Sequence, residues 1–177
     1  MKNEESTTEA IVNVSPIAYL MKNYADYNLW ANATLVNWLR TKPADILAKE
    51  VPSSFSTIQA TVVHIMQTQR YWLSVISHSE PDGVAPFTGT LEEALAELVD
   101  QSDIFADYVK AMAEADITEN TEVISPWFQC NFQNFEYILQ CMNHSTYHRG
   151  QIITIGRNLG FTDAPMTDYN FYNIHGK

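Results

Sequence analysis

The stretch NFEYILQCMNHSTYHRGQIITIGRNLG, residues 134–160, decides the fold. Its apolar side chains recur every three or four residues, so they lie on or beside one face of a helix. The members of this face are Tyr137, Cys141, Ile152, Ile155 and Leu159. The pattern predicts a helix from about Asn134 to Leu159, and Gly160 is suited to the left-handed conformation that ends many helices. A helix of this kind buries its apolar face against other helices.

Three earlier segments share this periodicity. They cover residues 15–42, 54–77 and 90–112. The first begins with Ser15 and Pro16, an N-cap residue followed by a proline at the first helical position. The third opens with Thr90, which can form a capping box with Glu93. Most of the six glycines and seven prolines fall between the segments, which indicates an all-α protein, most simply a four-helix bundle.

Residues 116–131, before the last helix, follow a different pattern. Their content of Thr, Val, Ile, Trp and Phe permits either a short strand pair or a long ordered connection. Residues 1–14 are polar and acidic and are expected to form a flexible leader. The 163 residues from 15 to 177 are expected to form a single domain, since the chain has 177 residues in all.

The charge balance excludes several classes of partner. Ten Lys and Arg stand against 21 Asp and Glu, which gives a net charge of −11 and no basic patch for nucleic acid or anionic lipid. No apolar run approaches the ~18 residues of a membrane span. With two cysteines and no signal-peptide pattern, the chain is expected to be soluble and cytoplasmic.

His144 and His148 are the first candidates for chemistry. They lie four residues apart, so both imidazoles project from the apolar face of the last helix. Two neighbouring buried imidazoles are costly to charge, and a divalent metal would accept a lone pair from each neutral ring. Hydrogen-bonded core histidines are the alternative. The zinc protease pattern HExxH is absent, because Ser145 follows His144.

His64 is the candidate for a third ligand, and its position is ambiguous. It lies beside the wide apolar arc of its helix, on a column that also contains Thr57, Thr61, Thr68, Tyr71 and Val75. One interpretation is a half-exposed histidine. The other is a pocket wall in which Thr61 and Thr68 leave room for a ligand. In that case the apolar arc faces elsewhere in the core or a second subunit, which is the basis for expecting a homodimer.

The chain resembles the DinB/YfiT-like family of metalloenzymes. Four stretches carry the resemblance: YADYNLWANATLVNWL, SSFSTIQATVVHIMQTQRYWLSVI, NHSTYHRGQIITIGRNLG and APMTDYNFY, which together span residues 24–172. The combination HxxxHRGQ with an earlier helical histidine is fairly specific. The resemblance implies a four-helix bundle with one long crossover connection, and a metal held by His64, His144 and His148.

Three neutral imidazoles suit zinc or nickel better than magnesium or calcium, which prefer oxygen ligands. Three protein ligands leave a coordination position open for water or substrate. Characterised members of the family are similar to transferases and isomerases that use low-molecular-weight thiols. The resemblance therefore implies a metal-dependent transferase using a small thiol, or a hydrolase, acting on a small molecule. Alternatives are a non-catalytic metal or ligand binder and a structural bundle without metal.

Several neighbours of the three histidines have competing interpretations. Gln151 could orient a ligand or satisfy a buried backbone group, and Cys141 could be a fourth ligand, a reactive thiol or inert core. Asp168 could accept a hydrogen bond from a ligating imidazole or cap a turn. Arg149 points away from His144, which predicts a surface ion pair.

Overall fold

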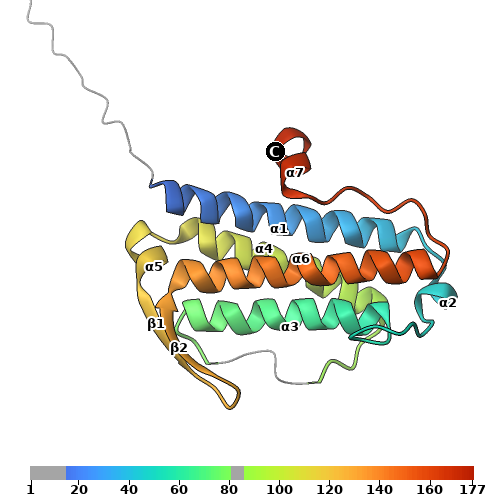
Figure 1. Cartoon of the computed structure of the whole chain (residues 1–177), viewed down its shortest axis with the longest axis horizontal. Coiled ribbons are helices and arrows are strands. Elements are labelled where there is room, and N and C mark those ends of the chain that lie inside the picture. The colour runs from blue at the N-terminus through green and yellow to red at the C-terminus, as the bar shows by residue number, and fades with distance from the viewer. Residues whose placement is uncertain (1–14, 81–85) are drawn as a thin grey trace, which may run out of the picture.

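The computed structural model describes residues 15–80 and 86–177. Within these ranges the chain forms four long helices: α1 (Pro16–Arg40), α3 (Ile58–Ile76), α4 (Leu91–Ala111) and α6 (Asn134–Asn158). The shorter elements are α2 (Ala44–Leu47), α5 (Glu114–Thr118), β1 (Asn120–Ile124), β2 (Gln129–Gln133) and α7 (Tyr169–His175). The predicted helical bundle with a strand pair before the last helix is confirmed (Figure 1). The expected leader, residues 1–14, lies outside the described residues.

The four long helices form a closed ring of contacts. Helix α1 packs on α4 and α6, and α3 packs on the same two helices, so α1 and α3 occupy opposite corners. Helices α3 and α4 run in the same direction, as the colour gradient in Figure 1 shows. The chain between them therefore has to return along the length of the bundle, which is the long crossover. The arrangement makes α3 and α6 antiparallel neighbours.

Local signals set most of the helix ends. Thr90 and Glu93 form the predicted capping box, and Gly160 adopts a φ of 96° after α6. The start of α3 differs from the prediction, because the helix begins at Ile58 and not near Ser54. The hydroxyl of Thr57 accepts a hydrogen bond from the Ala60 amide at 3.1 Å, which caps α3 at that point.

The apolar arc of α3 is buried inside the bundle. Its members Ile58, Val62, Ile65 and Met66 are all 0% exposed, and Ile76 is 2% exposed. Of the other members of the arc, Trp72 is 9% exposed and Leu73 is half-buried. One chain therefore covers most of the arc. The homodimer stays a prediction, but the width of this arc no longer supports it.

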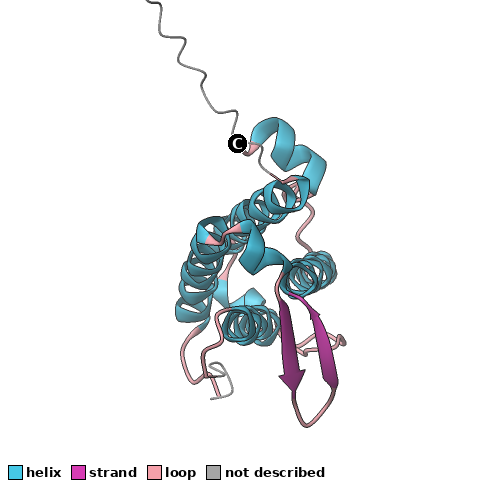
Figure 2. Ribbon diagram, turned by 90° about the vertical axis from the view of Figure 1, so that its left-hand side faces the viewer, coloured by secondary structure: helices cyan, strands magenta, loops and turns pink. Residues whose placement is uncertain are grey.

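The strand pair packs against one end of the α3–α6 groove. Strands β1 and β2 are antiparallel, and the hairpin extends away from the helices in Figure 2. The hydroxyl of Tyr137 on α6 donates to the Thr121 carbonyl at 2.7 Å and accepts from the Phe132 amide at 3.0 Å. Trp72 of α3 stacks on Tyr137 with ring centroids 5.3 Å apart, so both helices hold the hairpin in place.

The C-terminal tail packs back on the bundle. Tyr172 of α7 is buried against Tyr27 of α1, with ring centroids 5.7 Å apart. In the described part of the chain, no helix combines the length with the apolar character that crossing a bilayer demands.

Candidate metal centre

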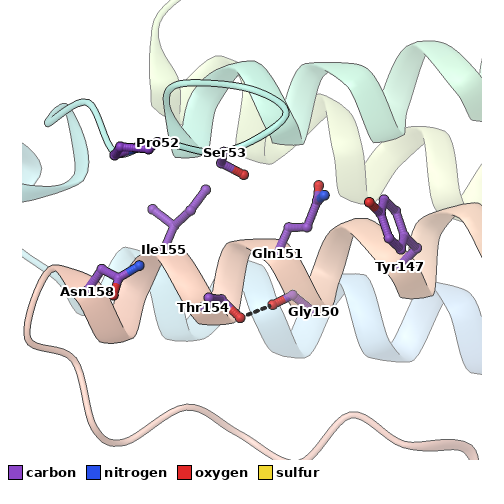
Figure 3. Close-up of a pocket in the computed structure, with 8 residues that line it drawn as sticks. All are labelled: Pro52, Ser53, Tyr147, Gly150, Gln151, Thr154, Ile155 and Asn158. Carbon is purple, nitrogen blue, oxygen red and sulfur yellow. Dashed lines mark hydrogen bonds between the residues drawn. The ribbon is translucent and has the colours of Figure 1, made fainter.

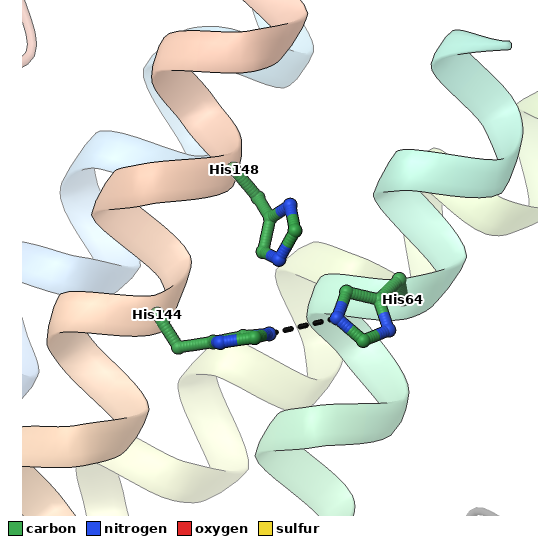
Figure 4. A group of neighbouring side chains, drawn as sticks. All are labelled: His64, His144 and His148. Atoms are coloured by element: carbon green, nitrogen blue, oxygen red, sulfur yellow. Dashed lines mark hydrogen bonds between the residues drawn. The ribbon is translucent and has the colours of Figure 1, made fainter. Parts of the chain in front are cut away.

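Three imidazoles from two helices converge in the α3–α6 groove. His64 comes from α3, and His144 and His148 lie one turn apart on α6 (Figure 4). The Nε2 atoms of His64 and His144 are 2.7 Å apart, and the candidate ligand atoms of all three residues lie within 4.8 Å of one another. Donor nitrogens of a tetrahedral zinc site lie roughly 3.3 Å apart, between these two values. The group could hold a metal ion.

The ring of His148 supplies the strongest indication that a cation fits. Its Nδ1 lies 2.7 Å from Gln151 Oε1. Because a carboxamide oxygen only accepts, Nδ1 carries the proton and Nε2 keeps its lone pair. His148 is 4% exposed, and within residues 15–80 and 86–177 its Nε2 has no hydrogen-bond partner. A buried acceptor without a donor is costly, and a divalent cation among the three rings would satisfy it.

The segment before α3 packs over two of the three rings. We call residues 51–57 the covering segment. Its Phe55 ring packs on the imidazoles of His64 and His148, with ring centroids 4.5 and 5.7 Å apart. The amide nitrogen of Gln151 donates to the Ser54 hydroxyl at 3.0 Å. Gln151 therefore holds His148 with its oxygen and the covering segment with its nitrogen.

Burial and crowding keep the three imidazoles neutral. Desolvation, followed by the neighbouring rings of His148 and His144, lowers the pKa of His64 from 6.5 to about 4. Desolvation also lowers the pKa of His144 and of His148 below the ordinary value. At neutral pH all three rings are therefore neutral and each keeps one nitrogen lone pair, as zinc or nickel ligands require.

We expect these shifts to make the metal-free protein sensitive to acid. Unfolded His64 binds a proton near pH 6.5 and folded His64 only near pH 4, so the unfolded state holds more protons between these values. The stability contributed by the neutral ring is therefore present above pH 6.5 and is lost as the pH falls towards 4. Urea unfolding of the metal-free protein across this range, beside a His64→Gln variant, measures it. Equal pH slopes for both proteins would contradict the expectation.

The two threonines that were predicted to form pocket walls, Thr61 and Thr68, have different environments. Thr61 is 0% exposed, and its hydroxyl donates to the Thr57 carbonyl of its own helix at 2.9 Å. The prediction that Thr61 lines a ligand pocket is therefore wrong, because the first turn of α3 already uses its side chain and the core encloses it. Thr68 is half-buried one turn beyond His64, and its role in a pocket stays a prediction.

Asp168 has the capping role. It is exposed at the start of α7, where its carboxylate accepts a hydrogen bond from the Phe171 amide at 2.9 Å. No described contact joins it to an imidazole. The second role suggested for it, as acceptor for a ligating histidine, is not the one that this geometry supports.

Cys141 belongs to the core and not to the candidate ligand set. It is 0% exposed, and the group of possible metal ligands found among the described residues contains the three histidines alone. Burial raises the pKa of the Cys141 thiol, so the thiolate that a ligand or nucleophile requires is disfavoured.

We therefore expect the two cysteines to react at different rates. Cys130 is half-buried on β2, whereas Cys141 is enclosed. Iodoacetamide should modify Cys130 in the native protein and Cys141 only after unfolding. Peptide mapping by mass spectrometry distinguishes the two sites. Rapid modification of Cys141 under native conditions would show that its thiol is accessible.

Arg149 is the residue that sequence reasoning placed wrongly. It is 2% exposed and forms no surface ion pair in the described part of the chain. The helical wheel correctly directs it away from His144. That direction leads to α1, because α6 packs on α1 as well as on α3.

Two hollows border the centre. One, of about 280 Å³, lies between the covering segment and the outer side of α6, and its wall includes Tyr147 and Gln151 (Figure 3). The other, of about 430 Å³, includes His64 itself and lies beside Phe55 and Phe87. The second hollow is large enough for a small molecule to approach His64.

Comparisons with known proteins point to one family. A model of the DinB family matches residues 15–175. The chain is 26% identical over 155 residues to a protein named DinB from Bacillus subtilis strain 168, which covers 83% of this chain and 90% of that protein. It is also similar in fold to a crystal structure of a DinB-like protein from Bacillus cereus ATCC 10987. That match has a TM-score of 0.63 and 17% identity, and it covers 79% of this chain and 90% of the other.

Proposed function

The chain belongs to the DinB family, and from that premise we propose that it is a divalent-metal-dependent enzyme acting on a small molecule. Its most specific form is a transferase that uses a low-molecular-weight thiol, with zinc or nickel held by His64, His144 and His148. The observation that carries the proposal is the buried Nε2 of His148, which has no hydrogen-bond partner among the described residues and lies beside the other two rings.

The chain's own residues prepare the centre. When bound, zinc or nickel supplies Lewis acidity and lowers the pKa of a thiol or water at its open position. Gln151 holds the proton of His148 at Nδ1, so that Nε2 keeps its lone pair for a metal ion. Phe55 and Tyr147 pack on the imidazoles and reduce the access of water to them.

The composition of the site favours thiol transfer over hydrolysis. The candidate ligand group found within the described ranges includes no carboxylate, and its three histidines would all be bound to the metal. No member of the group would then be free to act as the Glu, Asp or His base that hydrolases commonly use. A thiol ionises near pH 8.5 and needs little help from a base. In the proposed reaction the sulfur forms a bond to an electrophilic carbon, the leaving group departs with its electron pair, and the thiol proton passes to solvent.

The wall of the hollow beside His64 suggests the charge of the substrate. The described residues that line it include no Lys, Arg, Asp or Glu; they are Phe55, Thr57, Gln59, Ala60, Val63, His64, Gln67, Pro86 and Phe87. An anionic electrophile would find no cationic partner there, and the chain has a net charge of −11. We propose a neutral electrophile with an apolar part.

The test is a turnover assay on metal-loaded protein. Zinc-loaded and nickel-loaded samples would be mixed with 1-chloro-2,4-dinitrobenzene and, in turn, cysteine, glutathione and coenzyme A. A metal-dependent rate above the uncatalysed one, lost in a His148→Ala variant, is the expected result. If the protein bound metal tightly but no combination of metal and thiol reacted faster than the uncatalysed mixture, the enzyme hypothesis would give way to a non-catalytic metal-binding protein.

A further inference from the structure

Arg149 is a buried cation without an anionic partner. Its side chain is 2% exposed, and no carboxylate pairs with it in the described ranges. Its Nη1 donates to Asn28 Oδ1 at 2.8 Å and to Asn32 Oδ1 at 2.9 Å. Its Nη2 donates to the hydroxyls of Tyr27 at 3.1 Å and Thr146 at 2.8 Å. Buried charges are usually paired, so this arrangement needs an explanation.

The hydrogen bonds continue from Arg149 to every long helix. Asn28 on α1 donates to Gln69 on α3 at 3.1 Å, and Asn32 donates to Ser102 on α4 at 2.9 Å. Gln69 also donates to Ser102, at 3.2 Å. Because the amide oxygens of both asparagines accept from the guanidinium, their NH₂ groups are left to donate to these partners on α3 and α4. The network therefore specifies one arrangement of the four long helices relative to one another.

The arrangement of the helices determines where the histidines of the candidate metal centre lie. Arg149 follows His148 directly, so α6 presents its histidines to α3 and its arginine to α1. Side-chain atoms lie about 5–6 Å from a helix axis, so a rotation of α6 by about 10° would displace them by about 1 Å. Metal–ligand distances tolerate only about 0.2 Å. A device that fixes the rotation of α6 would therefore control whether its two histidines reach His64.

We propose that Arg149 is a positioning residue that fixes the rotation of α6, so that His144 and His148 meet His64 in one ligand set. The proposal rests on the metal-binding part of the proposed function. The proposal explains why the residue is an arginine. The planar guanidinium donates in fixed directions to four acceptors on α1 and α6, which an ammonium group cannot do.

Charge and positioning predict opposite effects on metal affinity. A positive charge near the centre repels a cation, so its removal alone would strengthen metal binding. Loss of positioning weakens metal binding. Arg149→Lys keeps the charge and loses the fork, whereas Arg149→Met loses both. Arg157→Met is the matched control, because Arg157 lies exposed on the same helix outside the network.

The experiment is a zinc competition titration against a chromophoric chelator, with folding checked by circular dichroism. Both Arg149 variants should bind zinc at least about tenfold more weakly than the parent, and Arg157→Met should bind it equally. Tyr27→Phe, which removes one acceptor on α1, should give a smaller loss and serves if Arg149→Met does not fold. Unchanged or tighter binding by the folded Arg149→Lys protein would overturn the proposal.

A second readout separates this proposal from the proposed function. In the metal-free protein, NMR of the imidazole nitrogens should show changed shifts for His144 and His148 in Arg149→Lys but not in Arg157→Met. If the parent binds no zinc, the proposed function fails, and the imidazole spectra still decide the role of Arg149. Identical spectra in all three proteins would overturn the positioning role.

Discussion

Replacing His64, His144 or His148 with alanine is expected to lower zinc or nickel affinity by at least about 100-fold and to remove the metal from purified protein. Loss of a partner that merely orients a ligand costs about 10- to 100-fold, and loss of a ligand costs at least as much. His64 comes from α3, and the other two histidines come from α6, so neither helix holds the complete ligand set. Elemental mass spectrometry of tag-free protein prepared without chelator measures the content.

The matched control for this series is His175→Ala. His175 is exposed at the end of α7 and takes no part in the group of possible ligands within the described residues. It should keep the parent's metal content. Parent protein without metal, even after zinc and nickel are added, would contradict the metalloenzyme hypothesis and leave three hydrogen-bonded core histidines.

Replacing Ile65 with alanine is expected to have the opposite pattern: a large loss of stability with the metal retained. Ile65 neighbours His64 in sequence, is 0% exposed and packs in the core that joins α1, α3, α4 and α6. Truncation of such a side chain costs about 2–5 kcal/mol, from lost burial and the cavity left behind. Urea unfolding with and without zinc measures the loss.

The two substitutions together separate fold from site. His64→Ala should abolish metal binding with a small effect on the metal-free fold, because the ring of His64 is only half-buried and its truncation leaves a smaller cavity than that of a core side chain. Ile65→Ala should unfold at lower urea and still gain stability when zinc is added. If metal binding fell as far in Ile65→Ala as in His64→Ala, the ligand assignment would lose its support.

Local sequence signals predicted the helices well because their causes are local. Pro16 at the start of α1, the capping box of Thr90 and Glu93, and Gly160 after α6 each act within one turn of chain. The start of α3 was predicted one turn early, since serines at 53, 54 and 56 are also good cap residues. Thr57 is the residue that caps α3, and the local pattern alone does not distinguish it from these serines.

The site was predicted less completely, because a helical wheel gives directions and not neighbours. His144 and His148 share a face by spacing alone, and that part needed no tertiary information. His64 was ambiguous until the pairing of α3 with α6 was known. Arg149 was placed on the surface because the wheel could not show that α1 covers the other side of α6.

The two-sided hydrogen bonding of Gln151 has a consequence for dynamics. One side-chain amide joins His148 to Ser54, so ordering of the imidazole and ordering of the covering segment are thermodynamically linked. A cation that fixes His148 should slow amide hydrogen exchange in residues 51–57, and an opening of those residues should loosen the cation by the same factor. Metal release would then require local opening of the covering segment, and residues that are not themselves ligands would influence how readily the metal leaves.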